Sequence, residues 1–262
     1  MDDSLYGAIF KRKSFHLFRN TGDAVITEPE LAELETAYRS FEPLCPEIRT
    51  AIRIVPGGDT SCRRGEQYCV MLYSEKKDGY LQNIGYLGEQ LDLYLVARDI
   101  GTLWFGMGKT DEKTYDGLDF VIMIAIRKID DPAKFRKDMF KSKRKAVKEI
   151  WEGDNIADVA DVVRFAPSAC NSQPWFVHNT GNGELCVYRY RRPDWRGIMP
   201  SKMVPFFNRI DIGIFMCFLE LCLAHASTRC TKRRRQRPGP RPRRMCSDQW
   251  TVISGQFLVV SF

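Results

Sequence analysis

Residues 166–175 concentrate short polar side chains between two prolines. They read Ala-Pro-Ser-Ala-Cys-Asn-Ser-Gln-Pro-Trp, so two hydroxyls and two amides fall within six positions. Prolines stiffen a turn, and hydroxyl and amide groups both donate and accept hydrogen bonds. A rigid turn of this kind can present several polar groups to a flat polar ligand. The alternative interpretation is an ordinary capped loop.

Two further segments carry distinctive patterns. Residues 12–18 read Arg-Lys-Ser-Phe-His-Leu-Phe, and residues 101–106 read Gly-Thr-Leu-Trp-Phe-Gly. They resemble the RxSxRxF and GLGTxWxG motifs of the nitroreductase family of flavoproteins, and residues 166–175 resemble its APSxxNxQPW loop. With Ile210-Asp-Ile-Gly213, these motifs span about residues 9–226. The resemblance is to a divergent, duplicated branch of that family, of the TM-nitroreductase type.

This resemblance implies an FMN cofactor and assigns residues to it. In the family the basic motif meets the FMN phosphate, which implies this role for Arg12 and Ser14; His16 stands where the family has Arg or Lys, which are stronger partners for an anion. The resemblance further implies that the Asn/Gln loop bonds the ribityl chain and the ring edge, and that a backbone N–H near residue 105 approaches the hydride-accepting nitrogen. The implied cofactor-binding residues are Arg12, Lys13, Ser14, His16, Phe105, Gly106, Pro167, Ser168, Asn171 and Gln173.

No catalytic side chain is required for this chemistry, because the flavin carries the electrons. The resemblance implies that NAD(P)H donates hydride and that a nitro or quinone compound accepts the reducing equivalents. The three histidines fall in no triad or metal-ligand spacing, and the sequence contains no GxSxG, Walker or GxGxxG motif. We therefore expect no metal site.

The spacing of the motifs indicates an internal duplication. In ordinary family members the basic motif and the Asn/Gln loop lie within a few tens of residues, and the flavin sites straddle a homodimer interface. Here roughly 150 residues separate them, which fits one complete site per chain in a fused pseudo-dimer. Residues 84–95 and 212–223 also align at an offset of 128. The alternative is that any two Leu-rich amphipathic helices align this well.

The hydrophobic pattern predicts the elements that would position these motifs. We expect a short helix in residues 5–18, a helix capped by Thr27 and Glu30, and long helices over 83–100, ended by Gly101, and 208–226. Residues 155–165 also have a helical pattern. Strands are predicted over 51–55, 67–73 and 185–190, and the apolar run 120–126 predicts a central strand. The expected fold is α+β, nitroreductase-like, with an antiparallel-rich sheet flanked by helices and two related halves.

Composition limits the protein class. The chain has 262 residues, 44% of them hydrophobic, which is enough for a substantial core without disulfides. Nine scattered cysteines with no CxxC pair favour a reducing compartment, and we expect a cytoplasmic protein with neither a zinc ribbon nor a signal peptide. The most apolar run, 210–226, is too short and too charged for a membrane span.

The basic character belongs to one segment. Nine Lys or Arg and no Asp or Glu lie between Arg229 and Arg244, so removing them from the net charge of +7 leaves −2. We expect a nitroreductase-like domain over 1–227, with halves of about 1–130 and 131–227, and a disordered or aberrant Arg/Pro-rich tail over 228–262. A reading-frame slip, a genuine basic tail and a degenerate end remain alternatives for the tail.

Three functions are compatible with these features. The first is an FMN-dependent NAD(P)H oxidoreductase acting on a small-molecule electron acceptor, as a monomeric pseudo-dimer or a homodimer. The second is a non-catalytic flavin-binding or sensing protein on the same scaffold. The third is a nucleic-acid binder that acts through the tail. We expect the first, and expect neither a membrane nor a nucleic-acid partner.

Overall fold

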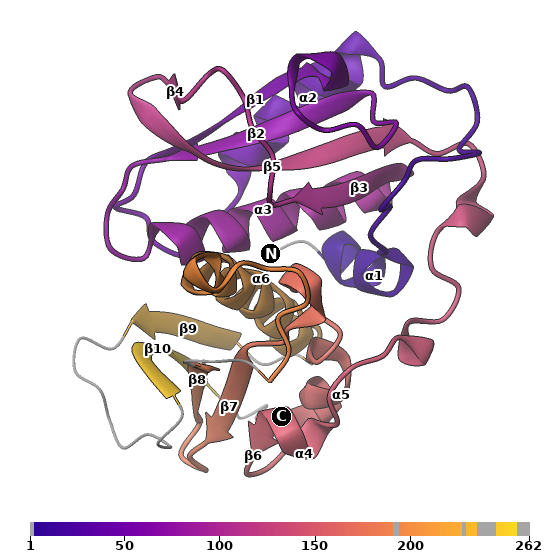
Figure 1. Cartoon of the computed structure of the whole chain (residues 1–262). Coiled ribbons are helices and arrows are strands. Elements are labelled where there is room, and N and C mark those ends of the chain that lie inside the picture. The colour runs from indigo at the N-terminus through magenta and orange to yellow at the C-terminus, as the bar shows by residue number, and fades with distance from the viewer. Residues whose placement is uncertain (1–2, 191–193, 227–228, 235–244, 256–262) are drawn as a thin grey trace, which may run out of the picture. The chain divides into compact units, whose positions relative to one another are not determined.

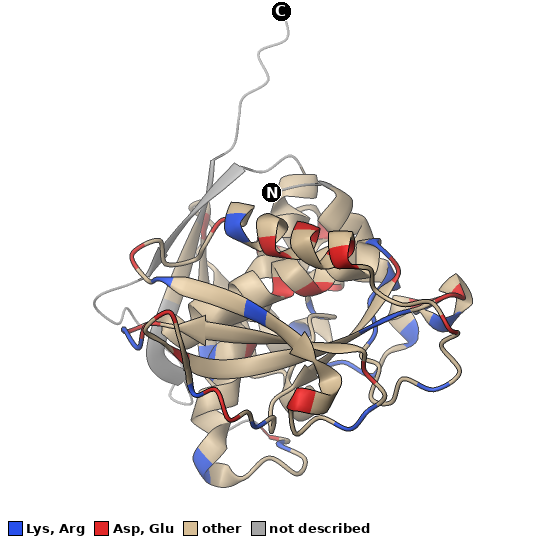
Figure 2. Cartoon of the chain, turned by 90° about the horizontal axis from the view of Figure 1, so that it is seen from above, with Lys and Arg blue, Asp and Glu red and all other residues tan. Residues whose placement is uncertain are grey.

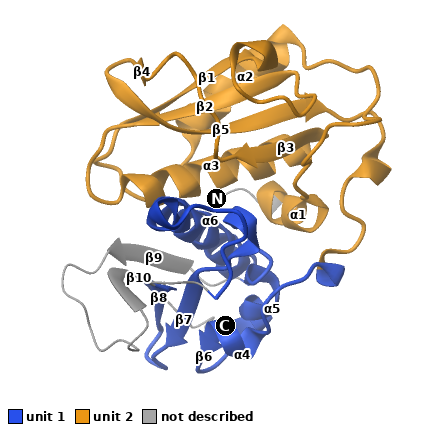
Figure 3. Cartoon of the chain, in the orientation of Figure 1, with its two compact units in different colours: residues 1, 140–262 blue, residues 2–139 orange. Residues whose placement is uncertain are grey.

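The computed structural model describes residues 3–190, 194–226, 229–234 and 245–255. The chain divides into two compact units, one formed by residues 2–139 and the other by residue 1 and residues 140–262 (Figure 3). We call these the N-terminal unit and the C-terminal unit, and each is described by itself. The predicted boundary between the halves near residue 130 lies close to this division.

The N-terminal unit is an antiparallel sheet with helices (Figure 1). Its strands run in the order β1-β2-β5-β3, and a short β4 pairs with β5. Helices α1 and α3 contact each other, and α3 also packs against β2, β3 and β5. The elements are α1 (Asp3–Lys11), α2 (Glu28–Ser40), β1 (Thr50–Pro56), β2 (Tyr68–Ser74), α3 (Tyr80–Ala97), β3 (Ile100–Phe105), β4 (Thr114–Tyr115) and β5 (Leu118–Lys128).

Local sequence signals explain several of these elements. Thr27 caps α2, accepting from the Glu30 backbone N–H, while the Glu30 carboxylate accepts from the Thr27 N–H at 2.9 Å. The predicted capping box is therefore confirmed. β5 lies between β2 and β3, and Met123 to Ile126 are completely buried, as the continuous apolar run predicted.

Helices α1 and α3 end at other residues than the sequence predicted. α1 ends at Lys11, so the basic motif follows the helix and is not part of it. α3 begins at Tyr80 and ends at Ala97, and Asp99 adopts a left-handed φ of 59°. Gly101 does not end this helix but lies inside β3, where a Cβ would come within 2.9 Å of the Phe15 ring. The glycine thus allows Phe15 to pack against the strand.

The C-terminal unit is built around a second sheet. Its strands run in the order β6-β7-β8-β10-β9, antiparallel apart from the parallel β6–β7 pair. The long α6 carries an apolar, buried surface, and Phe215 on it stacks on Trp175. The elements are α4 (Val147–Ile150), β6 (Trp151–Glu152), α5 (Val159–Val163), β7 (Trp175–Asn179), β8 (Glu184–Tyr190), α6 (Val204–His225), β9 (Arg229–Arg234) and β10 (Met245–Gly255).

The two sheets share one strand order. β1-β2-β5-β3 in the N-terminal unit corresponds to β7-β8-β10-β9 in the C-terminal unit, and the long helix α3 or α6 follows the second strand in each. In each unit the last strand, β5 or β10, inserts between two earlier strands. The predicted α+β fold with antiparallel sheet and helices is confirmed, but the strands form two sheets, one in each unit, where the sequence predicted one.

The prediction of a helix over residues 155–165 is wrong for its first turn. The α-helical part spans only Val159–Val163, because Ala157 and Asp158 have φ angles of 46° and 56°. The Asn155 side-chain oxygen accepts from the Ala160 backbone N–H at 2.8 Å. This local side-chain bond offers the backbone an alternative to a helical turn.

The segment after Ser227 differs from the predicted disordered tail where the structure describes it. Residues 229–234 and 245–255 form β9 and β10, which pair with each other and with β8. Trp250 and Val252 are buried, and strand pairing through the backbone does not require apolar side chains throughout. β10 thus pairs with β8 and extends the second sheet. The prediction for residues 235–244 and 256–262 lies outside the described residues.

Charged residues of both signs are distributed along the described helices and strands. Figure 2 shows Lys and Arg interspersed with Asp and Glu. None of the helices within the described ranges combines the length and the apolar character needed to cross a bilayer.

Candidate functional site

The predicted site residues fall into two groups, one in each unit. Arg12, Lys13, Ser14 and His16 lie with Phe105 and Gly106 in the N-terminal unit. Pro167, Ser168, Asn171 and Gln173 lie in the C-terminal unit. Each group is described within its own unit, and the hypothesis that both contact one flavin stays a prediction.

Arg12 is the best-buried residue of the basic motif. It lies directly after α1, and its Nε and Nη2 donate to the same oxygen of Asp92 at 3.0 and 2.8 Å. The Glu89 carboxylate lies 3.5 Å from Nε. Although burial lowers it, the charges of Asp92 and Glu89 raise the pKa of Arg12 above its ordinary value. The guanidinium is thus held as a cation within the fold.

Two carboxyl groups, Glu89 and Asp92, lie beside Arg12. Burial, and then the charge of Asp92, raise the pKa of Glu89 well above its usual range, which favours its neutral form. Asp92 accepts hydrogen bonds from Arg12, from the Thr102 hydroxyl and from Trp104 Nε1, the last at 2.9 Å. This network joins the basic motif to α3 and β3. It gives Arg12 a structural partner that sequence analysis did not predict.

Further cations gather around Lys13. Partial burial, and then the positive charges of Lys134 and Arg136, lower the pKa of Lys13. Burial and the charge of Arg12 likewise lower the pKa of Arg136, whose backbone N–H is fixed by a 3.0 Å bond to the Lys11 carbonyl. We call Lys13, Lys134 and Arg136 the cation cluster. Because its charges repel one another, a bound anion would stabilise it.

Lys134 and Arg136 were missed by sequence analysis as site residues. The available signal was the Lys-rich stretch that begins at residue 134, directly after the central strand. Nothing in that stretch indicated that it returns to the basic motif. Only the fold brings residues more than 120 positions apart into electrostatic contact.

Ser14 connects the basic motif to β3. It forms a parallel bridge with Thr102, and the Phe15 N–H donates to the Thr102 carbonyl at 2.9 Å. Three residues further along the same strand, Phe105 is half-buried beneath the Arg64 guanidinium, 5.9 Å from its ring centroid. Ser14 therefore lies beside β3, the strand that ends at Phe105 and leads into Gly106. His16 is exposed.

The Asn/Gln loop has an unusual backbone. Cys170, Asn171 and Gln173 have φ angles of 51°, 56° and 45°, in the left-handed region that non-glycine residues rarely adopt. The Ser168 hydroxyl accepts from the Gln173 N–H at 3.0 Å, which closes the turn. Backbone strain of this kind gathers at functional sites, where the surroundings hold it in place.

The amides of the loop are fixed by residues 143–145. Arg144 Nη1 donates to the Asn171 side-chain oxygen at 2.8 Å, and the Lys145 N–H donates to the Gln173 side-chain oxygen at 2.8 Å. Asn171 in turn donates to the Lys143 carbonyl at 3.2 Å. Sequence analysis missed this second basic segment as a partner of the loop. Pro167 and Ser168 are half-buried beside it.

Helix α6 holds the loop from beneath. Asp211 accepts from the Ala169 N–H at 2.9 Å, and the buried Ser172 hydroxyl lies 3.4 Å from both Asn208 and Asp211. Burial raises the pKa of Asp211 to about 8. The Asn208 side-chain nitrogen is buried without a hydrogen-bond partner among the described residues. The loop is thus anchored to a polar patch on an otherwise apolar helix.

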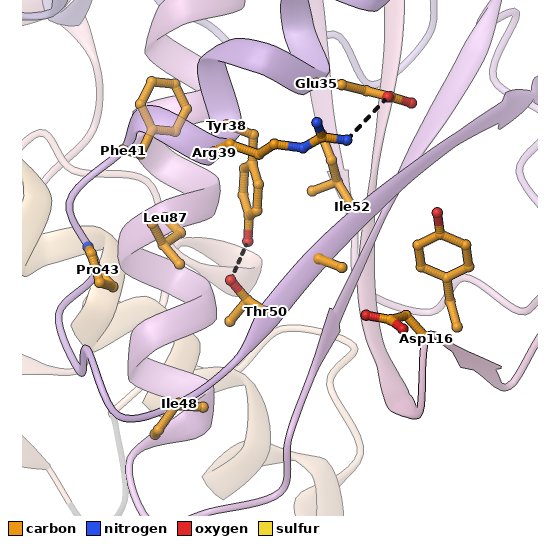
Figure 4. Close-up of a pocket in the computed structure, with 12 residues that line it drawn as sticks. Glu35, Tyr38, Arg39, Phe41, Pro43, Ile48, Thr50, Ile52, Leu87 and Asp116 are labelled. Carbon is orange, nitrogen blue, oxygen red and sulfur yellow. Dashed lines mark hydrogen bonds and ion pairs between the residues drawn. The ribbon is translucent and has the colours of Figure 1, made fainter.

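A cavity of about 480 Å³ lies elsewhere in the N-terminal unit. Residues of α2, β1 and α3 line it, and Figure 4 shows the Tyr38 hydroxyl bonded to Thr50 and the Arg39 guanidinium facing Glu35. None of the predicted site residues lines this cavity. It is therefore not the site that the motifs indicate.

Comparison with known proteins identifies the family. Residues 4–223 match the family described as Putative TM nitroreductase, and the chain belongs to that family. A crystal structure of a putative nitroreductase from Thermotoga maritima has the same fold, with 20% identity, a TM-score of 0.61, and coverage of 95% of this chain and 93% of that one. The comparison with curated proteins returned no match.

Two solved structures are more distantly similar. One is a putative NADH dehydrogenase/NAD(P)H nitroreductase from Parabacteroides distasonis, with 10% identity and a TM-score of 0.41, covering 57% of this chain and 97% of that one. The other is a putative nitroreductase in complex with FMN from Desulfovibrio desulfuricans, with 14% identity and a TM-score of 0.42, covering 59% and 99%.

Proposed function

We propose that this nitroreductase-family protein is an FMN-dependent oxidoreductase that takes hydride from NAD(P)H and reduces a nitro or quinone compound. The observation that carries the proposal is the cation cluster at the basic motif, where the Arg136 N–H donates to the Lys11 carbonyl at 3.0 Å and brings a second basic segment beside Lys13. Such crowding is unfavourable without a counter-ion, and a phosphate carries about two negative charges.

The residues present suit FMN in kind. The cation cluster and the Ser14 hydroxyl match the needs of a phosphate. The Ser168 hydroxyl and the two amides of Asn171 and Gln173 match those of a ribityl chain and a heterocycle edge. FMN, when bound, supplies the two-electron chemistry, and the protein supplies binding and orientation.

Each group would perform a distinct task. Lys13, Ser14 and Arg136 would bind the phosphate, while Arg12 would hold the motif against α3 through Asp92. His16, being exposed, is free to approach the phosphate as the cofactor enters. The strained turn at Asn171 and Gln173 would fix the orientation of the ring, because residues 143–145 hold both amides in place. The backbone at Phe105 and Gly106 would face the reactive part of the ring.

We further propose that the chain is an internal duplication that forms one such site. Both sheets have the same strand order. Asn83 on α3 accepts from the Cys45 N–H at 2.9 Å, and Asp211 on α6, 128 positions later, accepts from the Ala169 N–H at the same distance. A loop held in the same way on equivalent helices supports a common origin of the halves.

The test begins with the visible spectrum of the purified full-length chain. We expect bound flavin, or uptake of one FMN per chain after reconstitution, followed by anaerobic bleaching on addition of NADH or NADPH and recovery with a nitroaromatic or quinone. FMN binding without bleaching would support a flavin-binding protein without turnover. A chain that takes up no FMN would refute the proposal.

A variant pair tests the assigned loop. Asn171→Ala should weaken FMN binding by about 1–3 kcal/mol, because it removes a polar partner. Asn182→Ala, which changes an exposed asparagine in the same unit, serves as the control and should leave FMN affinity unchanged. Equal affinities for both variants would remove Asn171 from the site.

A further inference from the structure

Two buried cysteines and a glutamate, none of them assigned to FMN, meet in the N-terminal unit. Cys62 lies in the connection between the 3-10 turn Gly57–Asp59 and β2, Glu66 follows it, and Cys69 is the second residue of β2. Their two sulfur atoms and a Glu66 carboxylate oxygen lie within 4.8 Å of one another. Both cysteines have no exposed surface, whereas Glu66 is half-buried.

This spacing suits a tetrahedral metal ion. Zinc–sulfur bonds of about 2.3 Å place two sulfur ligands about 3.8 Å apart, so the three donors need to approach by no more than about an ångström. Thiolates with a carboxylate favour zinc over magnesium or calcium, which take oxygen ligands only. The half-exposed Glu66 provides a route of entry from solvent.

The immediate surroundings complete the donor set and the charge. The Thr60 hydroxyl lies 3.4 Å from Cys69 Sγ and accepts from the Cys62 N–H at 3.1 Å, so it provides a further oxygen beside the sulfur donors. Two thiolates and one carboxylate exceed the charge of a divalent ion by one. The Arg63 guanidinium, which donates to the Thr60 and Cys62 carbonyls, lies close enough to offset that excess.

We propose that Cys62, Glu66 and Cys69 bind one zinc ion, with water at the fourth position. Without a metal, both thiols hold their protons at pH 7, because the ordinary pKa of a cysteine is about 8.5, and zinc binds the thiolate form. Zinc binding replaces these two protons, which leave to buffer, and no oxidation or reduction takes place.

The ion would stabilise a loop that supports the basic motif. Between the cysteines, the Arg64 carbonyl accepts from the Phe18 N–H at 2.8 Å, and the Arg64 side chain covers Phe105. Gly65 approaches Phe18 so closely that a Cβ would lie 2.9 Å from its carbonyl oxygen. Fixing Cys62 and Cys69 to one ion therefore restrains the segment that follows His16.

The test uses the full-length chain, stripped with a chelator and titrated with zinc. We expect one zinc per chain by elemental analysis, release of two protons per zinc by calorimetry in buffers of different ionisation enthalpy, and a thiolate-to-metal charge-transfer band when cobalt replaces zinc. Cys62→Ser and Cys69→Ser should abolish the cobalt band. Glu66→Gln should weaken zinc binding by about tenfold or more, since even residues that only support ligands cost that much.

The matched control is Cys45→Ser, which alters another buried cysteine of the same unit that lies outside the cluster. It should bind zinc as the native chain does. If the serine variants fail to fold, the proposal is tested by the cobalt band of the native chain and by the zinc affinity of Glu66→Gln. No stoichiometric zinc, an unchanged cobalt band in a folded Cys62→Ser/Cys69→Ser variant, or a disulfide joining these two cysteines in protein purified under reducing conditions would overturn the proposal.

Discussion

Arg12 gives two hydrogen bonds to a single oxygen of Asp92, from Nε at 3.0 Å and from Nη2 at 2.8 Å. Both side chains are almost fully buried. The bond joins the start of the basic motif to the middle of α3, 80 positions away. A residue of a motif associated with anion binding therefore also maintains the fold of the N-terminal unit.

Arg12→Ala should destabilise the protein. It leaves Asp92 and Glu89 buried without a cation, and loss of one partner from a buried ion pair costs about 3–5 kcal/mol. Urea unfolding of the flavin-free chain measures this. Arg39→Ala is the control, because Arg39 pairs with Glu35 at 3.9 Å with most of its side chain exposed, and such pairs contribute little. Equal stabilities of the two variants would contradict the structural role of Arg12.

Asp211 should make stability depend on pH. Its ordinary pKa is 3.8, and burial raises it to about 8 in the folded chain. Between these values the folded chain keeps a proton that the unfolded chain releases, so the free energy of unfolding falls as pH rises, by up to about 1.4 kcal/mol per pH unit. Below about pH 4 Asp211 is protonated in both states and causes no loss of stability. Above about pH 8 it is ionised in both states, and the loss of stability from burying its charge has reached its full value.

Asp211→Asn isolates this effect. An amide retains an oxygen for the Ala169 N–H but does not titrate. The stability of the variant relative to the native chain should therefore increase from about pH 4 to about pH 8 and stay constant above, as measured by urea unfolding across that range. A relative stability that does not change with pH would show that Asp211 is not held protonated.

Two of the helix glycines, Gly7 and Gly88, should respond oppositely to substitution by alanine. A Cβ at Gly7 in α1 meets nothing within 4 Å, so Gly7→Ala should stabilise the protein by about 0.5–1 kcal/mol. A Cβ at Gly88 in α3 would lie 2.5 Å from the Trp104 ring and 3.3 Å from Leu72. Overpacking should then cost about 1–3 kcal/mol. Thermal unfolding should show a higher melting temperature for Gly7→Ala and a lower one for Gly88→Ala than for the native chain.

The cation cluster should distinguish FMN from riboflavin, which lacks the phosphate. Arg136→Met should weaken FMN binding by about 1.5–3 kcal/mol, the contribution of a hydrogen bond to a charged group, and leave riboflavin binding unchanged. Lys137→Met removes the neighbouring exposed charge and serves as the control. A parallel loss of riboflavin affinity in Arg136→Met would show that Arg136 acts on the fold rather than on the phosphate.

Local signals in the sequence predicted much of the fold. The capping box at Thr27 and the apolar run that became β5 were readable because each depends on near neighbours or on continuous burial. The first turn of the 155–165 segment was not, because the bond from Ala160 to the Asn155 side chain competes with a helix that the apolar pattern alone favours. Basic residues in β9 similarly concealed a strand that backbone pairing maintains.

The motifs predicted which residues to assign to the site, but not which other residues contact them. The resemblance marked Ser14, Asn171 and Gln173, but not that Asp92 engages Arg12 or that Arg136 returns to Lys13. Neither relationship has a short-range signature, because each joins positions about 80 or more apart. The Cys62–Glu66–Cys69 cluster was likewise overlooked, since six residues separate the cysteines and no CxxC pair marks them.

The left-handed backbone of Cys170, Asn171 and Gln173 sets up a conflict between durability and ligand recognition. Each such residue costs about 1–3 kcal/mol, which glycine would largely recover. Laboratory evolution that selects heat resistance alone should therefore accumulate glycine at these three positions, and the resulting proteins should hold flavin more loosely. Selection for cofactor retention should instead preserve the present residues at these positions, although the melting temperature is then lower than with glycine.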